Sequence, residues 1–249
     1  MTDISIPILF AIGATFFAAG TVKGVTGMGL PTVAMGVLAA LISPLTAASL
    51  LIVPSFVTNV WQLLAGPGLW PILRRFWIMM LAICAGTMLG AAWLSGGNTG
   101  ATTKILGAAL IVYACYTLVA RQLAVPRRVE PLLSPLVGAA TGIMSGATGL
   151  FVIPAVPYLQ SLGLDRDDLV QAFGLSFTVS TIALAAALGA HGAFAVGTLG
   201  ISALAVAPAL AGMWVGQKLR QRISPAMFRR VFLIFLLLLG VEMLLHPFG

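Results

Sequence analysis

Charged residues are scarce in this sequence. Asp, Glu, Lys and Arg make up only 8% of its 249 residues, whereas 60% are hydrophobic, and the mean hydropathy is +1.08. A soluble domain carries about 25% charged residues, so this chain cannot cover a water-facing surface. We therefore expect a membrane protein and exclude a cytosolic enzyme, a nucleic-acid-binding protein and a secreted disulfide-rich domain.

Acidic residues are rarer than basic ones. The sequence has 6 Asp and Glu against 13 Lys and Arg, a net charge of +7, and no acid lies in the middle of an apolar segment. Proton relays across membranes use buried carboxylates or histidines. The two histidines, His191 and His246, lie in a short loop and near the C-terminus. The sequence therefore predicts no intramembrane proton relay.

Groups that carry catalysis or bind metals are also lacking. Cys84 and Cys115 lie in apolar stretches, which predicts two buried free thiols rather than a disulfide. No Cys/His metal spacing, phosphate-binding loop or nucleophile–base pair occurs, so we predict no metal, no cofactor, no catalytic residue and no ATP-driven pump. The first residues lack the positive region of a signal peptide, and we expect the first helix to be retained.

Hydropathy and Gly/Pro breaks divide the chain into ten apolar segments. Their expected bounds are 4–22, 30–42, 45–65, 71–94, 102–120, 132–145, 150–162, 168–190, 195–217 and 226–246. The segments 30–42, 132–145 and 150–162 are too short to cross about 30 Å of hydrocarbon, which is typical of broken or re-entrant helices. We predict an all-α, polytopic transmembrane bundle with about 8–10 membrane segments.

The two halves of the sequence are related. Residues 18–27 read AAGTVKGVTG and residues 140–149 read ATGIMSGATG, with five identical positions. Downstream, Gly86 and Gly90 align with Gly212 and Gly216. An internal duplication is predicted, and its parts are a first repeat at 1–123, a cytoplasmic linker at 124–131 and a second repeat at 132–249.

Basic residues predict that the repeats are inverted. One basic cluster follows the third apolar segment, and another follows the ninth. Parallel repeats would place these clusters on opposite faces of the membrane, against the positive-inside rule. Inverted repeats place both on the cytoplasmic face and both termini outside. The expected cytoplasmic set is Arg74, Arg75, Arg121, Arg127, Arg128, Lys218, Arg220 and Arg222.

Each half has a glycine-rich break after its first segment. The first break is KGVTGMGLP at 23–31, and its counterpart is SGATG at 145–149, followed by Pro154. Free backbone N–H groups at a helix start attract anions, and Pro31 suits the first turn of a new helix. Two inverted breaks that meet near the midplane would form one anion site, with charge from Lys23. The alternative is that these glycines only allow close helix packing and that Lys23 only extends to the membrane interface.

A polar stripe runs along two related segments. Ser55, Thr58, Asn59 and Gln62 are spaced i, i+3, i+4 and i+7, so they share one helix face. Such groups either line a path for an anion or make hydrogen bonds between helices. The predicted substrate-binding residues of the breaks and stripes are Lys23, Thr26, Gly27, Met28, Gly29, Thr58, Asn59, Gln62, Ser145, Gly146, Thr148, Gly149, Ser176, Ser180 and Thr181.

The two breaks and the run QAFGLSFTVST at 171–181 resemble the sulfite exporter TauE/SafE family, also called the toluene-sulfonate uptake permeases. The resemblance covers almost the whole chain. It implies a transporter of the bacterial inner membrane for sulfite, sulfoacetate, other organosulfonates or related small sulfur-containing anions. Many members have a fuller glycine cluster in both breaks, whereas Phe151 stands opposite Gly29 here, which makes the two breaks unequal.

We expect the partners to be a small anion and the lipid bilayer, with no nucleic acid, and transport to proceed by alternating access. Without a buried acid, an exporter would be driven by the inside-negative potential, about 2.3 kcal/mol per charge per 100 mV, enough for a roughly 50-fold outward gradient of a monoanion. The alternatives are an anion channel, a proton-coupled uptake permease, and a membrane enzyme or assembly factor that holds a lipid or protein partner. The sequence leaves the oligomeric state open.

Overall fold

The computed structural model describes residues 6–119, 124–194 and 196–247, and every regular element in them is helical. The first half contains α1 (Ile6–Thr26), α2 (Leu30–Leu41), α3 (Pro44–Leu64), α4 (Leu69–Ser95) and α5 (Thr99–Val119). The second half contains α6 (Glu130–Thr148), α7 (Ala155–Ser161), α8 (Arg166–Ala190), the 3-10 turn η1 (Val196–Thr198), α9 (Leu199–Leu204), α10 (Val206–Leu219) and α11 (Pro225–Leu245). The prediction of an all-α bundle is confirmed.

Six stretches of helix in the described ranges are long and apolar enough to cross a membrane. They are α1, α3, α4, α5, α8 and the continuous stretch Leu199–Leu219 that joins α9 and α10. Two of the segments expected to be short are short, because α2 has 12 residues and α7 has 7. The third is longer than expected, although it is not among these six spans: α6 has 19 residues, because the polar residues at both of its ends, from Glu130 and up to Thr148, also join the helix.

The cysteine prediction is correct for pairing and wrong for burial. Neither thiol is in a disulfide; Cys84 is half-buried and Cys115 is exposed. Cys115 lies on a face of α5 that points away from the bundle, where lipid covers it in a membrane. An apolar stretch in the sequence does not distinguish a lipid-facing position from a core position, since both are hydrophobic.

Glycines bring helices of different halves into backbone contact. A Cβ atom on Gly24 of α1 would lie 2.2 Å from the carbonyl oxygen of Met213 on α10. A Cβ atom on the aligned Gly146 of α6 would lie 2.3 Å from the carbonyl oxygen of Thr87 on α4. Each half therefore packs its first helix against the fourth segment of the other half, and a larger residue does not fit at either crossing.

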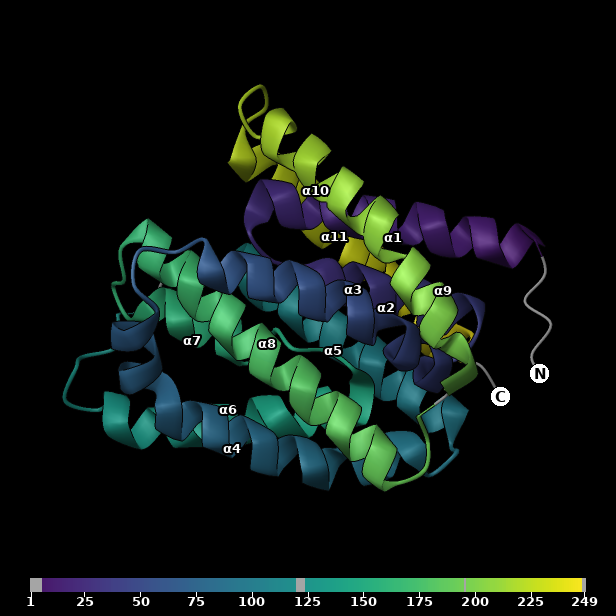
Figure 1. The fold of residues 1–249 in the computed structure, drawn as a ribbon, viewed down its shortest axis with the longest axis horizontal. Helices are drawn as coiled ribbons and strands as arrows, with labels where there is room; N and C mark the ends of the chain where they lie inside the picture. The colour runs from purple at the N-terminus through teal and green to yellow at the C-terminus, as the bar shows by residue number, and fades with distance from the viewer. Residues whose placement is uncertain (1–5, 120–123, 195, 248–249) are drawn as a thin grey trace.

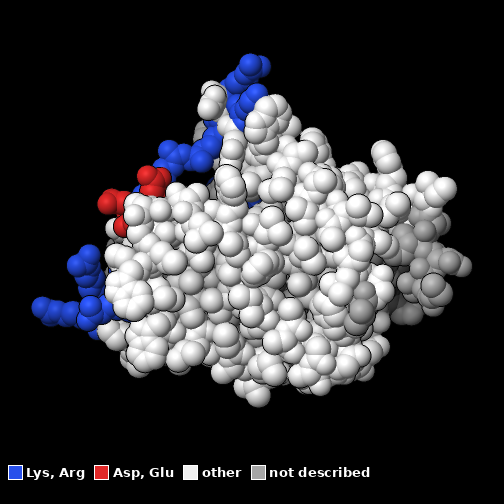
Figure 2. All heavy atoms as spheres, viewed as in Figure 1, with Lys and Arg blue, Asp and Glu red and all other residues white. Residues whose placement is uncertain are grey.

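Aligned helices run in opposite directions. In Figure 1, α1 and α10 run from right to left, whereas α6 and α4 run from left to right. On the face seen in Figure 2, the Lys and Arg side chains gather along the upper left, from the end of α10 at the top to the start of α4 at the left. Arg121 lies outside the described residues, so the structure does not test its predicted position. The orientation of the halves in a membrane stays a prediction.

An ion pair fastens α4 to α6 at this basic end. The Arg75 Nε and Nη2 atoms donate to the two carboxylate oxygens of Glu130 at 2.7 and 2.8 Å. The Tyr158 hydroxyl of α7 donates to the Glu130 carbonyl oxygen at 3.3 Å and shares a 2.7 Å hydrogen bond with the Ser134 hydroxyl. A bidentate pair of this kind is among the stronger side-chain interactions, so these three helices are joined where the charged residues gather.

Candidate functional site

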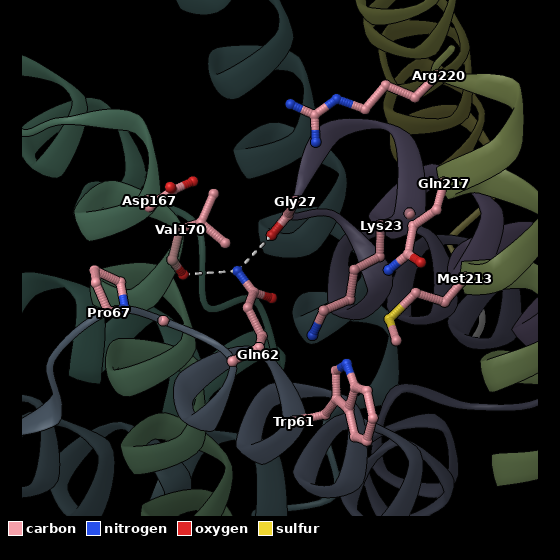
Figure 3. Close-up of a pocket in the computed structure, with 13 residues that line it drawn as sticks. Lys23, Gly27, Trp61, Gln62, Pro67, Asp167, Val170, Met213, Gln217 and Arg220 are labelled. Carbon is pink, nitrogen blue, oxygen red and sulfur yellow. Dashed lines mark hydrogen bonds between the residues drawn. The ribbon is translucent and has the colours of Figure 1, made fainter.

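A cavity of about 360 Å³ opens between α1, α3, α8 and α10 (Figure 3). Lys23 and Gly27 come from the first break, Gln62 from the end of α3, Asp167 from the first turn of α8, and Arg220 from the end of α10. The remaining lining residues are Gly24, Trp61, Ala65, Gly66, Pro67, Val170, Met213 and Gln217. Ligand sites typically have volumes of about 300–1,000 Å³, so the cavity is large enough for a small organic anion.

Lys23 is the one buried cation among the described residues, with 3% of its surface exposed. Its Nζ atom donates to Thr58 Oγ1 at 3.2 Å and to Asn59 Oδ1. No carboxylate of the described chain forms an ion pair with it. When protonated, this amine has three N–H donors, so two neutral partners leave one donor unused and the positive charge uncompensated. A buried charge is costly unless it is paired, and an anion in the cavity would pair it.

Hydrogen bonds behind Lys23 fix the direction of its two acceptors. Thr58 Oγ1 donates to the Pro54 carbonyl oxygen at 2.8 Å, which turns a lone pair toward Lys23. Asn59 Nδ2 donates to Thr181 Oγ1 at 3.4 Å, and the Thr181 hydroxyl donates to the Phe177 carbonyl oxygen at 2.7 Å. The stripe residues of α3 and α8 therefore meet, and together they hold the Lys23 side chain in the cavity wall.

Gln62 braces the cavity wall. Its Nε2 atom donates to the Gly27 carbonyl oxygen and to the Val170 carbonyl oxygen, both at 2.9 Å (Figure 3). Both N–H groups of the amide are used in these bonds. Gln62 therefore joins the first break and α8 to α3, rather than offering donors to a ligand.

The first break is organised by Thr26. Its hydroxyl oxygen lies 2.9 Å from the Val22 carbonyl oxygen and 2.7 Å from the Met28 carbonyl oxygen, and it accepts a hydrogen bond from the Met28 N–H at 3.2 Å. Gly27 and Gly29 adopt positive φ angles of 80° and 98°, a conformation that glycine reaches without strain. Of the break residues after Gly24, only Gly27 lines the cavity; Thr26, Met28 and Gly29 do not.

The second break has the same local geometry but packs away from the cavity. The Thr148 hydroxyl donates to the Met144 carbonyl oxygen at 2.6 Å and accepts from the Leu150 N–H at 3.3 Å. A Cβ atom on Gly149 would meet the Met35 side chain at 2.8 Å, and Gly146 lies against α4. The predicted residues that do not line the cavity on the second-half side are Ser145, Gly146, Thr148, Gly149, Ser176, Ser180 and Thr181.

The structure therefore divides the predicted set. It brings one group together at the cavity, either in the lining or in hydrogen bonds with Lys23 and its partners: Lys23, Gly27, Thr58, Asn59, Gln62 and Thr181. The other predicted residues lie in the two breaks or are buried on α8.

Sequence reasoning missed the α8 and α10 walls of the cavity. Met213 and Gln217 directly follow Gly212 and Gly216, the small residues at which α10 approaches α1, so a signal for them was present. Asp167 carries no such signal, because its place at the cavity mouth depends on how the start of α8 packs against α3.

Comparison with known proteins identifies a family for this chain. No curated protein and no solved structure matches the chain. The family model described as Sulfite exporter TauE/SafE matches residues 12–243, which is nearly the whole chain and includes both breaks and every residue of the cavity. The all-helical fold, the six apolar spans and this match lead to one conclusion: this multi-pass membrane protein belongs to the sulfite exporter TauE/SafE family of transporters.

Proposed function

We propose that this protein carries small sulfur-containing anions, such as sulfite, sulfoacetate or other organosulfonates, across the bacterial inner membrane, and that the cavity at Lys23 binds them. The observation that carries the proposal is the buried side chain of Lys23, which has no carboxylate partner in the described chain and lies in the wall of an open cavity. Membrane proteins retain such intramembrane charges for function.

The cavity chemistry favours an oxyanion. Lys23 and Arg220 contribute two positive charges to the lining, and Asp167 contributes one negative charge. The excess of positive charge attracts anions. The free N–H of Lys23 and the indole N–H of Trp61, which also lines the cavity, are donors suited to sulfonate oxygens. An apolar substituent of an organosulfonate would meet Met213 and Val170.

We further propose that the halves are inverted repeats, with bounds 1–123 and 132–249 and the linker 124–131, and that the basic end faces the cytoplasm. The opposite directions of aligned helices and the positive-inside rule support this orientation. Because Arg220 and Asp167 belong to the basic end, the cavity would open to the cytoplasm. Alternating access would then require a second conformation that opens to the other side.

The decisive experiment is flux in proteoliposomes that hold the full-length protein under a clamped membrane potential. Lys23→Met removes the charge and keeps the length of the side chain, and we expect it to slow sulfite or sulfoacetate efflux at least about tenfold, since hydrogen bonds to charged groups are strong. Lys104→Met is the matched control, because Lys104 is exposed and lies outside the cavity. It should leave efflux unchanged.

Other results would replace the proposal with a named alternative. Ohmic single-channel current carried by these anions would indicate a channel. Concentration of the anion against its gradient by a pH difference would indicate proton-coupled uptake. Efflux at the wild-type rate in the Lys23→Met variant would show that Lys23 does not bind the anion, and it would contradict the proposal.

A further inference from the structure

The packing of the two halves is equivalent atom by atom at the helix crossings. A Cβ atom on Gly20 would lie 2.1 Å from the Ala209 carbonyl oxygen, and one on Gly142 would lie 2.2 Å from the Ile83 carbonyl oxygen. Gly20 aligns with Gly142, and Ala209 with Ile83. The glycine contacts at Gly24 and Gly146 agree with the same alignment. The residues around Lys23 therefore have aligned counterparts in the second half, which we call the image site.

The image of the Lys23 site consists of hydroxyl groups. Ser145 takes the position of Lys23, Ser180 that of Thr58, and Thr181 that of Asn59. On the fourth segment of each half, Thr87 takes the position of Met213, which lines the Lys23 cavity. The two sites are adjacent, because the hydrogen bond from Asn59 to Thr181 joins a residue of one to a residue of the other.

These hydroxyl groups lack partners. Thr87, Ser145 and Ser180 are fully buried, and none of their hydroxyls has a hydrogen bond within the described residues. The same holds for Thr141 and Ser176, which lie one helical turn before Ser145 and Ser180. They lie on α4, α6 and α8, three helices that pack against one another. Ser and Thr in a helix commonly satisfy themselves by donating to a carbonyl oxygen of the preceding turn. A buried polar group left unpaired is costly, and five of the seven such hydroxyls among the described residues lie on these three helices, which points to a partner that they meet in another conformation.

We propose that Ser145, Ser180 and Thr87, with Thr141 and Ser176 beside them, form a second binding station for the oxygens of the transported anion, closed in this conformation. The inference rests on the proposed function. In an inverted-repeat carrier, exchanging the conformations of the two halves exchanges their environments, so the hollow at Lys23 closes as the image site opens toward the opposite side. Hydroxyl donors without a full charge hold the anion less tightly than Lys23, which favours its release there.

The first test is accessibility in full-length protein reconstituted after Cys84→Ala and Cys115→Ala. Ser180→Cys is treated with an anionic, membrane-impermeant thiol reagent applied at the side opposite the basic end. We expect labelling under sulfoacetate turnover and at least about a tenfold lower rate without substrate, as for a population shift between closed and open states. Ile182→Cys, exposed on the outer surface of the same helix, is the control and should stay unlabelled because lipid covers it.

The second test is flux through Ser145→Ala/Ser180→Ala, which removes both hydroxyls and adds no bulk. We expect efflux about tenfold slower, while sulfoacetate still raises the melting temperature as in the wild type, because the Lys23 cavity is intact. If efflux is unchanged and Ser180→Cys stays unlabelled while Lys23→Met abolishes transport, the second station is wrong and the proposed function stands. If wild-type protein transports none of these anions, the proposed function itself fails.

Discussion

Single glycines decide how closely α1 and α10 approach. The Cβ position of Gly24 is occupied by backbone atoms of α10, namely the Met213 carbonyl oxygen and the Gln217 nitrogen at 2.9 Å. Backbone cannot move aside as a flexible side chain does, so even one methyl group must separate the helices. Gly13 lies on the same helix with nothing within 4 Å of its Cβ position.

Gly24→Ala is therefore expected to destabilise the protein by about 1–3 kcal/mol, the usual cost of overpacking. Gly13→Ala should be neutral or slightly stabilising, because alanine has the higher helix propensity. Thermal unfolding of both variants in the same detergent measures the difference. Equal melting temperatures would show that α1 and α10 are not in the contact described.

Lys23 could be predicted from the sequence, because a lysine within an apolar, glycine-rich run is costly and needs a reason. Its partners Thr58 and Asn59 could also be predicted, since helical spacing puts them on one face. The role of Gln62 could not: the spacing places its side chain on that face, but which carbonyl oxygens it meets depends on α8 and on the first break.

At the scale of the helix, the two breaks show how a chain reverses direction inside the bundle. In each, a threonine hydroxyl bonds a carbonyl oxygen four residues back and an N–H two residues ahead, and a glycine with positive φ follows the threonine. The side chain thus satisfies backbone groups that a helix end leaves open. Buried backbone groups need such partners, because an unpaired one is costly where water does not reach it.

Replacing Thr26 tests this arrangement. Thr26→Val keeps the shape and removes the hydroxyl, so we expect a loss of about 0.5–1.5 kcal/mol of stability and weaker sulfite binding, because Gly27 lines the cavity. Thr26→Ser keeps the hydroxyl and should restore both. Thermal shifts with and without sulfite report the two effects together. A Thr26→Val variant that binds like the wild type would mean that the break holds its shape without the hydroxyl.

The helices were predictable as elements because hydropathy and the Gly and Pro positions mark them. The ends of α3 follow such marks: Ser43 caps the Thr46 N–H at 3.2 Å and Pro44 opens the helix. The length of α6 was underestimated because Glu130 and Thr148 are polar, although both are buried in the bundle. The cavity walls from α8 and α10 needed tertiary information, since a periodic pattern identifies a buried face and not the neighbour that covers it.

At the scale of the whole molecule, the distribution of charged residues predicts how the protein is oriented in the membrane, and this orientation can be tested. The positive-inside rule puts the basic end in the cytoplasm, and the loop between α4 and α5 lies at the other end (Figure 1). In a variant without native cysteines, an impermeant thiol reagent should label Asn98→Cys in intact spheroplasts. Arg128→Cys, an exposed position in the linker, should be labelled only after the membrane is opened. The reverse labelling pattern would show that the basic end faces the outside and would contradict this orientation.

The reciprocal glycine crossings have one more consequence. Glycines bring α1 against α10, α4 against α6 and α5 against α11, so each of these close pairs takes one helix from each half. The glycine contacts of these helices therefore join the two halves of the chain to each other. We infer that any bodies that move against one another during transport contain helices of both halves, so the linker at 124–131 would not be the hinge between them.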